Sequence, residues 1–307
     1  MVEIKNVAVL GASGNLGQVV VAALLKAGFV VTAVVRPESK ANTSPDVTVK
    51  TSSYSDTAAL TSAFQDQHAV VEAFNPAAAG HQRAIVEAAV AAGVSHLITP
   101  EFGADSFNPY LDEVLLYEPK LEAQRQLDDV LARTKATLSW TAVNIGVWFD
   151  WAIEQGIFWV DKRTKTITRF GSGNQKYCMS RLAMTGDAVV AVLKQPHLFH
   201  NRPAYFASHT VSTNELIGII KEELGGQEWK VVDVPLSGFA DEARKLWEQD
   251  TRDGVQDRLH TRAYAMLGTV SMFDENNRYG ADFGTKLEPG WDEGEAALRR
   301  RLKELLS

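Results

Sequence analysis

The sequence predicts an α/β protein in which a doubly wound parallel sheet is accompanied by a smaller, interleaved lobe. Two observations carry this prediction. An apolar stretch over residues 7–10 leads directly into a glycine-containing turn and an amphipathic helix. Short apolar strands then alternate with helical segments as far as residue 143. This alternation is typical of βαβ units whose helices cover both faces of a parallel sheet.

The composition is that of an ordinary globular protein, with 45% hydrophobic and 22% charged residues among 307. The net charge of -7 argues against a nucleic-acid partner, because basic surfaces bind the phosphate backbone. The single cysteine, Cys178, excludes an internal disulfide and a cysteine-based metal cage, and we expect no metal site. No secretion signal or membrane-spanning apolar run is visible, so we expect a cytoplasmic protein without membrane contact.

The N-terminal motif predicts a phosphate-binding turn. It reads Gly11-Ala-Ser-Gly-Asn-Leu-Gly17 and precedes a helix that continues to about Gly28. Glycines allow a sharp turn and close approach of a ligand, and the free N–H groups and dipole of a helix N-terminus favour a phosphate. Directly after a buried strand, this motif predicts a Rossmann-type dinucleotide site. Its expected residues are Gly11, Ser13, Gly14, Asn15, Leu16 and Gly17.

The end of the second strand, residues 30–35, bears on the choice of cofactor. In dinucleotide sites an acidic residue here holds the ribose hydroxyls of NAD, whereas a basic residue accommodates the 2′-phosphate of NADP. Arg36 stands at this place and Lys40 follows it, which favours NADPH. Two alternatives stay open: Glu38 could serve the ribose of NAD, and Arg36 could be a solvated loop residue.

The next strands are expected at residues 47–50, 69–74 and 96–99, with helices opening at Asp56 and running over residues 77–93. Ligands of such sheets bind beyond the carboxyl ends of the strands. Asn75 and the sequence Pro100-Glu-Phe-Gly103 follow two of these ends. We therefore expect them to line the cofactor groove.

Lys120 is the candidate catalytic residue. A helix is expected from Glu118 to about Arg133, with Lys120 in its first turn. At 100° per residue Lys120 falls in line with Leu127 and Leu131, so it heads the apolar stripe of the helix, although such a lysine can also snorkel outward. Partial burial and the helix N-terminus would lower the pKa of its amine toward neutrality, as proton transfer requires.

The chain changes character after the strand at residues 138–143. We place the boundary near residue 150, with a dinucleotide domain over 1–150 and a substrate-binding lobe over 151–307. Within the lobe we expect a hairpin over 157–170, a capped helix over 212–225, helices over 236–250 and 254–267, and a final helix from 294. A helix from Thr185 and a strand over 204–208 suggest that residues 183–210 return to the first domain.

The glycine motif, Arg36, the Pro100-Glu-Phe-Gly103 sequence and Lys120 together resemble the isoflavone reductase-like and NmrA-like branch of atypical short-chain dehydrogenases. The resemblance covers residues 4–150 and, in outline, the remainder. It implies NADPH bound across the glycine turn, Arg36 on the 2′-phosphate and Lys120 near the nicotinamide. Family reductases act on double bonds or benzylic ethers of phenylpropanoid-type compounds, and NmrA-type members bind the dinucleotide as sensors without turnover.

The chain lacks the tyrosine that usually serves as the general acid in the wider superfamily. Only two residues separate Tyr117 from Lys120, so the usual Tyr-x-x-x-Lys pair is missing. The loop before Lys120 also differs in spacing from that of the plant enzymes, so plant substrates are not assumed.

Large rings follow two strand ends and predict a flat, aromatic substrate. They are Phe102, Trp148, Phe149 and Trp151, and the alternative for each ring is core packing. We therefore expect an NADPH-dependent reductase of a small aromatic molecule, in which Lys120 assists proton transfer. The alternative is a dinucleotide sensor, and only that alternative calls for a protein partner.

Overall fold

The computed structural model describes residues 3–39, 44–74, 76–225 and 228–307. The expected cofactor residues Lys40 and Asn75 lie outside these ranges. Contacts divide the chain into two compact units. Unit 1 comprises residues 1–102, 118–143 and 183–204, and unit 2 comprises residues 103–117, 144–182 and 205–307.

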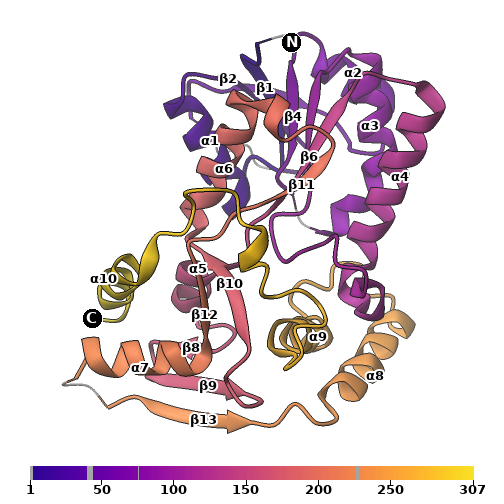
Figure 1. The fold of residues 1–307 in the computed structure, drawn as a ribbon. Coiled ribbons are helices and arrows are strands. Elements are labelled where there is room, and N and C mark those ends of the chain that lie inside the picture. The colour runs from indigo at the N-terminus through magenta and orange to yellow at the C-terminus, as the bar shows by residue number, and fades with distance from the viewer. Residues whose placement is uncertain (1–2, 40–43, 75, 226–227) are drawn as a thin grey trace. The chain divides into compact units, whose positions relative to one another are not determined.

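Unit 1 carries a seven-stranded sheet in the order β11-β6-β5-β4-β1-β2-β3 (Figure 1). All pairings between β3 and β6 are parallel. The chain starts in the middle of the sheet, builds one half and crosses over to build the other, which confirms the predicted doubly wound fold. The strands are β1 (Asn6–Leu10), β2 (Val30–Val35), β3 (Thr48–Thr51), β4 (Ala69–Glu72), β5 (His96–Thr99), β6 (Ser139–Asn144) and β11 (Arg202–Tyr205).

Helices cover both faces of this sheet (Figure 1). On one face α2 (Thr57–Phe64), α3 (Gln82–Ala91) and α4 (Glu118–Thr134) pack on alternate strand residues in one apolar cluster. On the other face lie α1 (Asn15–Lys26) and α6 (Leu182–Lys194), which meet where Gly186 approaches Val19 and Ala23. Because both faces are covered, the central strands are almost uniformly apolar, as the sequence showed.

Some helix boundaries of unit 1 differ from the expectation. The segment expected as one helix over 77–93 begins with a 3-10 helix, η1 (Pro76–His81), and continues as α3. Helix α6 begins at Leu182 rather than Thr185. The carboxylate of Asp150 accepts a hydrogen bond from the Leu182 N–H at 2.9 Å, so a residue far along the chain supports this helix start. A further 3-10 helix, η4 (Pro196–Leu198), follows α6.

Unit 2 contains two three-stranded sheets. One has the order β12-β10-β7 and the other β13-β9-β8. The strands are β7 (Val147–Trp148), β8 (Val160–Asp161), β9 (Thr166–Phe170), β10 (Lys176–Ser180), β12 (His209–Ser212) and β13 (Lys230–Val234). The helices are α5 (Phe149–Gln155), α7 (Thr213–Glu223), α8 (Phe239–Arg252), α9 (Arg262–Phe273) and α10 (Gly294–Leu306), with short 3-10 turns at Leu111–Glu113, Leu115–Tyr117 and Gly284–Lys286.

An aromatic cluster forms the core of unit 2. Trp159, Tyr177 and Phe273 are nearly fully buried, and their ring centroids lie 5.4 to 6.3 Å apart. The near-perpendicular ring planes are the arrangement that aromatic quadrupoles favour. Trp159 directly precedes β8, Tyr177 lies in β10 and Phe273 ends α9. The cluster therefore joins both sheets of the unit to a helix.

The elements of unit 2 were predicted only in part. The capping box of α7 is confirmed: Ser212 Oγ accepts from the Glu215 N–H and the Glu215 carboxylate accepts from the Ser212 N–H. The helix expected over 254–267 was wrong by several residues, because Gly254 adopts a positive φ and Thr261 caps α9 further on. Strands β10, β12 and β13 were not predicted.

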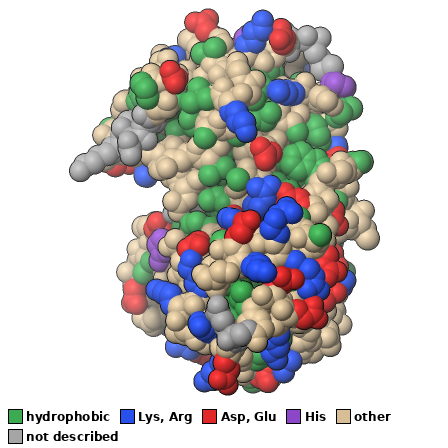
Figure 2. Space-filling view, turned by 90° about the vertical axis from the view of Figure 1, so that its left-hand side faces the viewer, with side chains coloured by type: hydrophobic (Ala, Val, Ile, Leu, Met, Phe, Trp, Pro, Cys, Tyr) green, Lys and Arg blue, Asp and Glu red, His purple; other side chains and the backbone are tan. Residues whose placement is uncertain are grey.

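The surface carries charges of both signs. On the face that Figure 2 shows, acidic and basic side chains are interspersed. Many are ion-paired, such as Arg83 with Asp129 at 2.6 Å and Arg278 with Glu113 at 2.5 Å. None of the helices in the described ranges is both long and apolar enough to cross a membrane.

Candidate functional site

The glycine turn of unit 1 is shaped by two close approaches. Gly11 has a φ of +76°, and a Cβ on it would lie 2.3 Å from the Ala73 carbonyl oxygen beyond β4. A Cβ on Gly17 would lie 2.0 Å from the Gly11 carbonyl oxygen. Neither position can hold a side chain, so these two glycines are required by the packing of β1, β4 and α1.

Gly14 is different, because the protein itself leaves room there. A Cβ on Gly14 would meet only the Gly11 carbonyl oxygen, at an ordinary 3.5 Å. Gly14 is the N-cap of α1 and offers no side chain to the helix N–H groups, and both Gly14 and Asn15 are exposed. This open helix N-terminus is suited to a phosphate.

The other two predicted residues of the turn have distinct surroundings. Ser13 is half-buried, and its carbonyl oxygen accepts a hydrogen bond from Gln18 Nε2 at 2.9 Å. Leu16 is buried with its side chain in the core. Leu16 could therefore contact a phosphate only through its backbone.

Tyr54 supports the turn and was missed in the sequence. Its hydroxyl accepts a hydrogen bond from the Gly11 N–H at 2.8 Å and donates one to the Val34 carbonyl oxygen at 3.2 Å. Its ring packs against Phe74 with centroids 5.6 Å apart. Tyr54 thereby ties the glycine turn to the end of β2, and burial raises the pKa of its hydroxyl.

Arg36 follows β2 directly, as predicted. Its Nε lies 3.2 Å from the Glu38 carboxylate, and the two side chains are 54% and 66% exposed. An ion pair that is this exposed contributes little, so a phosphate can replace Glu38 as the partner of the guanidinium.

Lys120 is buried on the apolar side of α4, as its spacing predicted. Only 9% of the residue is exposed, and its ammonium donates a hydrogen bond to the Glu101 carbonyl oxygen. The Glu101 carboxylate lies 3.9 Å from Lys120 Nζ. Burial lowers the pKa of Lys120, and the nearby negative charge of Glu101 opposes this shift.

A second buried carboxyl, Glu72, ends the neighbouring strand β4. It is fully buried, and Gln82 Nε2 donates a hydrogen bond to it at 3.0 Å. Burial raises the pKa of Glu72 to about 8, so this carboxyl is protonated at neutral pH. Glu72 was not predicted as a site residue, because its place beside Glu101 depends on which strands are neighbours.

The predicted aromatic residues have different environments within their own units. In unit 1, Phe102 is buried and has a φ of +39°, unusual for a bulky residue. In unit 2, Trp148 and Trp151 are half-buried and pack edge to face with centroids 6.2 Å apart. Phe149 is 1% exposed within the core cluster and packs against His209, as its packing alternative anticipated.

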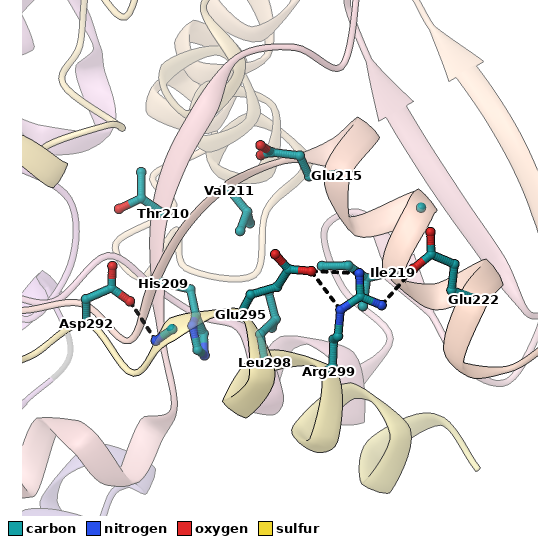
Figure 3. Close-up of a pocket in the computed structure, with 12 residues that line it drawn as sticks. His209, Thr210, Val211, Glu215, Ile219, Glu222, Asp292, Glu295, Leu298 and Arg299 are labelled. Atoms are coloured by element: carbon teal, nitrogen blue, oxygen red, sulfur yellow. Dashed lines mark hydrogen bonds and ion pairs between the residues drawn. The ribbon is translucent and has the colours of Figure 1, made fainter.

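Unit 2 also contains a cavity of about 310 Å³ between β12, α7 and α10 (Figure 3). Its charged walls are already paired, since Arg299 contacts Glu222 at 2.7 Å and Glu295 at 2.6 Å. None of the site residues predicted from the sequence lines it. Within the described ranges, no group of three or more His, Cys, Asp or Glu side chains is arranged to hold a metal ion.

Comparison with known proteins identifies the family of the chain. A family model described as NAD(P)H-binding matches residues 11–175. The oxidoreductase aprR of Aspergillus flavus is 30% identical over 231 residues, which cover 74% of this chain and 76% of that protein.

Solved structures share the fold at low identity. A leucoanthocyanidin reductase–NADPH complex from Vitis vinifera aligns with a TM-score of 0.74 and 16% identity, covering 98% of this chain and 99% of that one. An isoflavone reductase aligns with a TM-score of 0.67 and 16% identity, covering 99% of each chain. These alignments show a shared fold, and the family model and the match to aprR show the NAD(P)H-binding family that the sequence resemblance implied.

Proposed function

The chain belongs to the NAD(P)H-binding family of oxidoreductases, and from this we propose that it is an NADPH-dependent reductase of a small aromatic substrate, with Lys120 as proton donor. The observation that carries the proposal is the buried Lys120. Lys120 is buried and donates a hydrogen bond to a backbone carbonyl oxygen. Burying a lysine costs free energy, and its side chain packs no better than an apolar one. Buried groups whose pKa is shifted by desolvation and a nearby charge concentrate at functional sites.

The open N-terminus of α1 and the exposed Arg36 support the choice of NADPH. The helix N-terminus would receive the pyrophosphate and Arg36 the 2′-phosphate, each through charge-assisted hydrogen bonds. The nicotinamide supplies the hydride when the cofactor is bound.

Lys120 would supply the matching proton. When hydride adds to one atom of a double bond, the π bond breaks and negative charge develops on the other side of it. When hydride replaces the oxygen of a benzylic ether, the C–O bond breaks and the negative charge develops on the departing oxygen. The ammonium of Lys120 donates its proton to that atom, and its lowered pKa makes the transfer easier. The hydroxyl of Tyr117 is bound to Ser271 Oγ at 3.2 Å, which favours the lysine as the acid.

The half-buried tryptophans support an aromatic substrate. Trp148 has a buried indole N–H without a hydrogen-bond partner among the described residues, so it can donate to a substrate oxygen. Trp148→Ala should weaken substrate binding more than NADPH binding, since stacking contributes on the order of 1 kcal/mol beyond area burial. An equal loss of affinity for substrate and for NADPH, together with a lower melting temperature, would indicate that Trp148 serves core packing instead.

The test is NADPH oxidation with a panel of phenylpropanoid-type double-bond and benzylic-ether compounds. Lys120→Met keeps the apolar stem, so we expect unchanged NADPH binding and turnover reduced roughly 100-fold or more. Lys194→Met, at an exposed lysine of α6 in the same unit, is the matched control. NADPH binding without turnover of any compound would favour the sensor, and native turnover by Lys120→Met would remove its chemical role.

A further inference from the structure

Lys120 sits in a buried polar cluster that no packing requirement explains. The cluster consists of the buried Glu72, Gln82, Glu101 and Lys120 and the half-buried Gln124, each contributed by unit 1. Its members come from the end of β4, the start of α3, the turn after β5 and the first turns of α4. The cluster thus gathers at the carboxyl ends of two neighbouring strands, where ligands of doubly wound sheets bind.

Glu101 contacts Lys120 in two ways. Its backbone carbonyl accepts the hydrogen bond from the ammonium, and its carboxylate lies 3.9 Å from the same nitrogen. The next residue, Phe102, holds a positive φ, and its N–H donates to the Val143 carbonyl oxygen at 2.8 Å. This constrained turn fixes the direction of the Glu101 carbonyl.

The carboxylate of Glu101 is itself held in place. Gln124 Nε2, one helical turn after Lys120, donates a hydrogen bond to Glu101 Oε1 at 3.1 Å. The other oxygen, Oε2, is fully buried, has no hydrogen-bond partner among the described residues and is the one that faces Lys120. The amide of Gln124 therefore orients the free oxygen toward the amine.

Glu72 offers an internal comparison within the same cluster. It is as deeply buried as Glu101, but its partner is the neutral amide of Gln82. Its carboxyl is protonated at neutral pH, so it contributes no charge there. Of these two buried carboxyls, Glu101 alone lies within 4 Å of the Lys120 ammonium.

We propose that Glu101 is the positioning residue of Lys120: its carbonyl directs the amine, and its carboxylate, oriented by Gln124, keeps the amine protonated in a buried site. An ammonium buried without an opposite charge would lose its proton. The role of Glu101 toward Lys120 stands on the geometry above. Its consequence for catalysis rests on the proposed function.

Glu101→Gln tests this directly, because it keeps the shape of the side chain and removes its charge. We expect the pKa of the Lys120 amine to fall by about one unit or more, that is, about tenfold in its protonation equilibrium. If Lys120 is the proton donor, the descending limb of the pH profile of turnover should move to lower pH by the same amount. Glu72→Gln is the matched control and should leave the Lys120 titration unchanged.

The titration is measured without turnover, by NMR of isotope-labelled lysine in the whole protein, with Lys120→Met to assign the signal. Thermal unfolding checks that each variant is folded. Should Glu101→Gln not fold, Glu101→Asp, which retracts the charge by one methylene, should lower the pKa by a smaller amount.

The outcomes separate the two proposals. An unchanged Lys120 titration in folded Glu101→Gln, or equal shifts in Glu101→Gln and Glu72→Gln, overturns the role of Glu101. A selective shift in Glu101→Gln supports it, even if no compound is reduced; in that case the proposed reductase function fails alone.

Discussion

Glu72 should make the stability of the protein fall as pH rises. Its pKa is about 8 in the folded protein and 4.5 in the unfolded chain, so the unfolded chain releases the proton first. The stabilisation is complete below pH 4.5 and is lost between pH 4.5 and 8. A difference of 3.5 pKa units corresponds to roughly 5 kcal/mol of unfolding free energy.

The variant Glu72→Gln isolates this effect. Glutamine keeps the size and hydrogen bonding of a protonated glutamate and does not titrate. The free energy of unfolding of the native protein and the variant is measured by urea denaturation at several values between pH 4.5 and 8. The free energy of unfolding of the native protein, minus that of the variant, should decrease by several kcal/mol from pH 4.5 to 8.

Comparing the two proteins also cancels the contributions of other titrating groups to the free energy of unfolding. Burial lowers the pKa of His96 to about 4 from 6.5, so His96 reduces stability as pH falls below 6.5, which is the opposite direction. Both proteins contain His96, and its contribution cancels in the difference. A difference that is flat from pH 4.5 to 8 would show that Glu72 is ionised when folded and would refute the reasoning.

Further predictions concern the cofactor site. Arg36→Ala should remove most of a preference for NADPH over NADH, since a charge-assisted contact contributes about 1.5 to 3 kcal/mol, and equal calorimetric affinity of the native protein for both cofactors would contradict the assignment. Glu38→Gln should tighten NADPH binding, because Arg36 then has no competing carboxylate; an unchanged affinity would mean that the ion pair does not compete. Gly17→Ala places a Cβ 2.0 Å from the Gly11 carbonyl oxygen and should lower the melting temperature, whereas Gly14→Ala, with its nearest contact at 3.5 Å, should weaken NADPH binding with little loss of stability. Similar melting temperatures for the two alanine variants would contradict the assignment of Gly17 to packing and of Gly14 to cofactor binding.

The sequence alone determined the features that depend on neighbours along the chain. The run from Val7 to Gly17 specified strand, turn and helix, because backbone freedom and apolar periodicity are local properties. The alternation of strands and helices specified the parallel sheet for the same reason. The helical spacing of Lys120 with Leu127 was enough to place this lysine on the apolar stripe of its helix.

The tertiary structure decided which distant groups meet. Tyr54 reaches the Gly11 N–H, and Asp150 supports the start of α6, through contacts that no local pattern encodes. Burial at Glu72 and Glu101 became visible only when β4 and β5 paired and α3 and α4 covered their ends. Local patterns determine which face of an element is buried, but the charge state of a buried group depends on the partners that long-range packing brings to it.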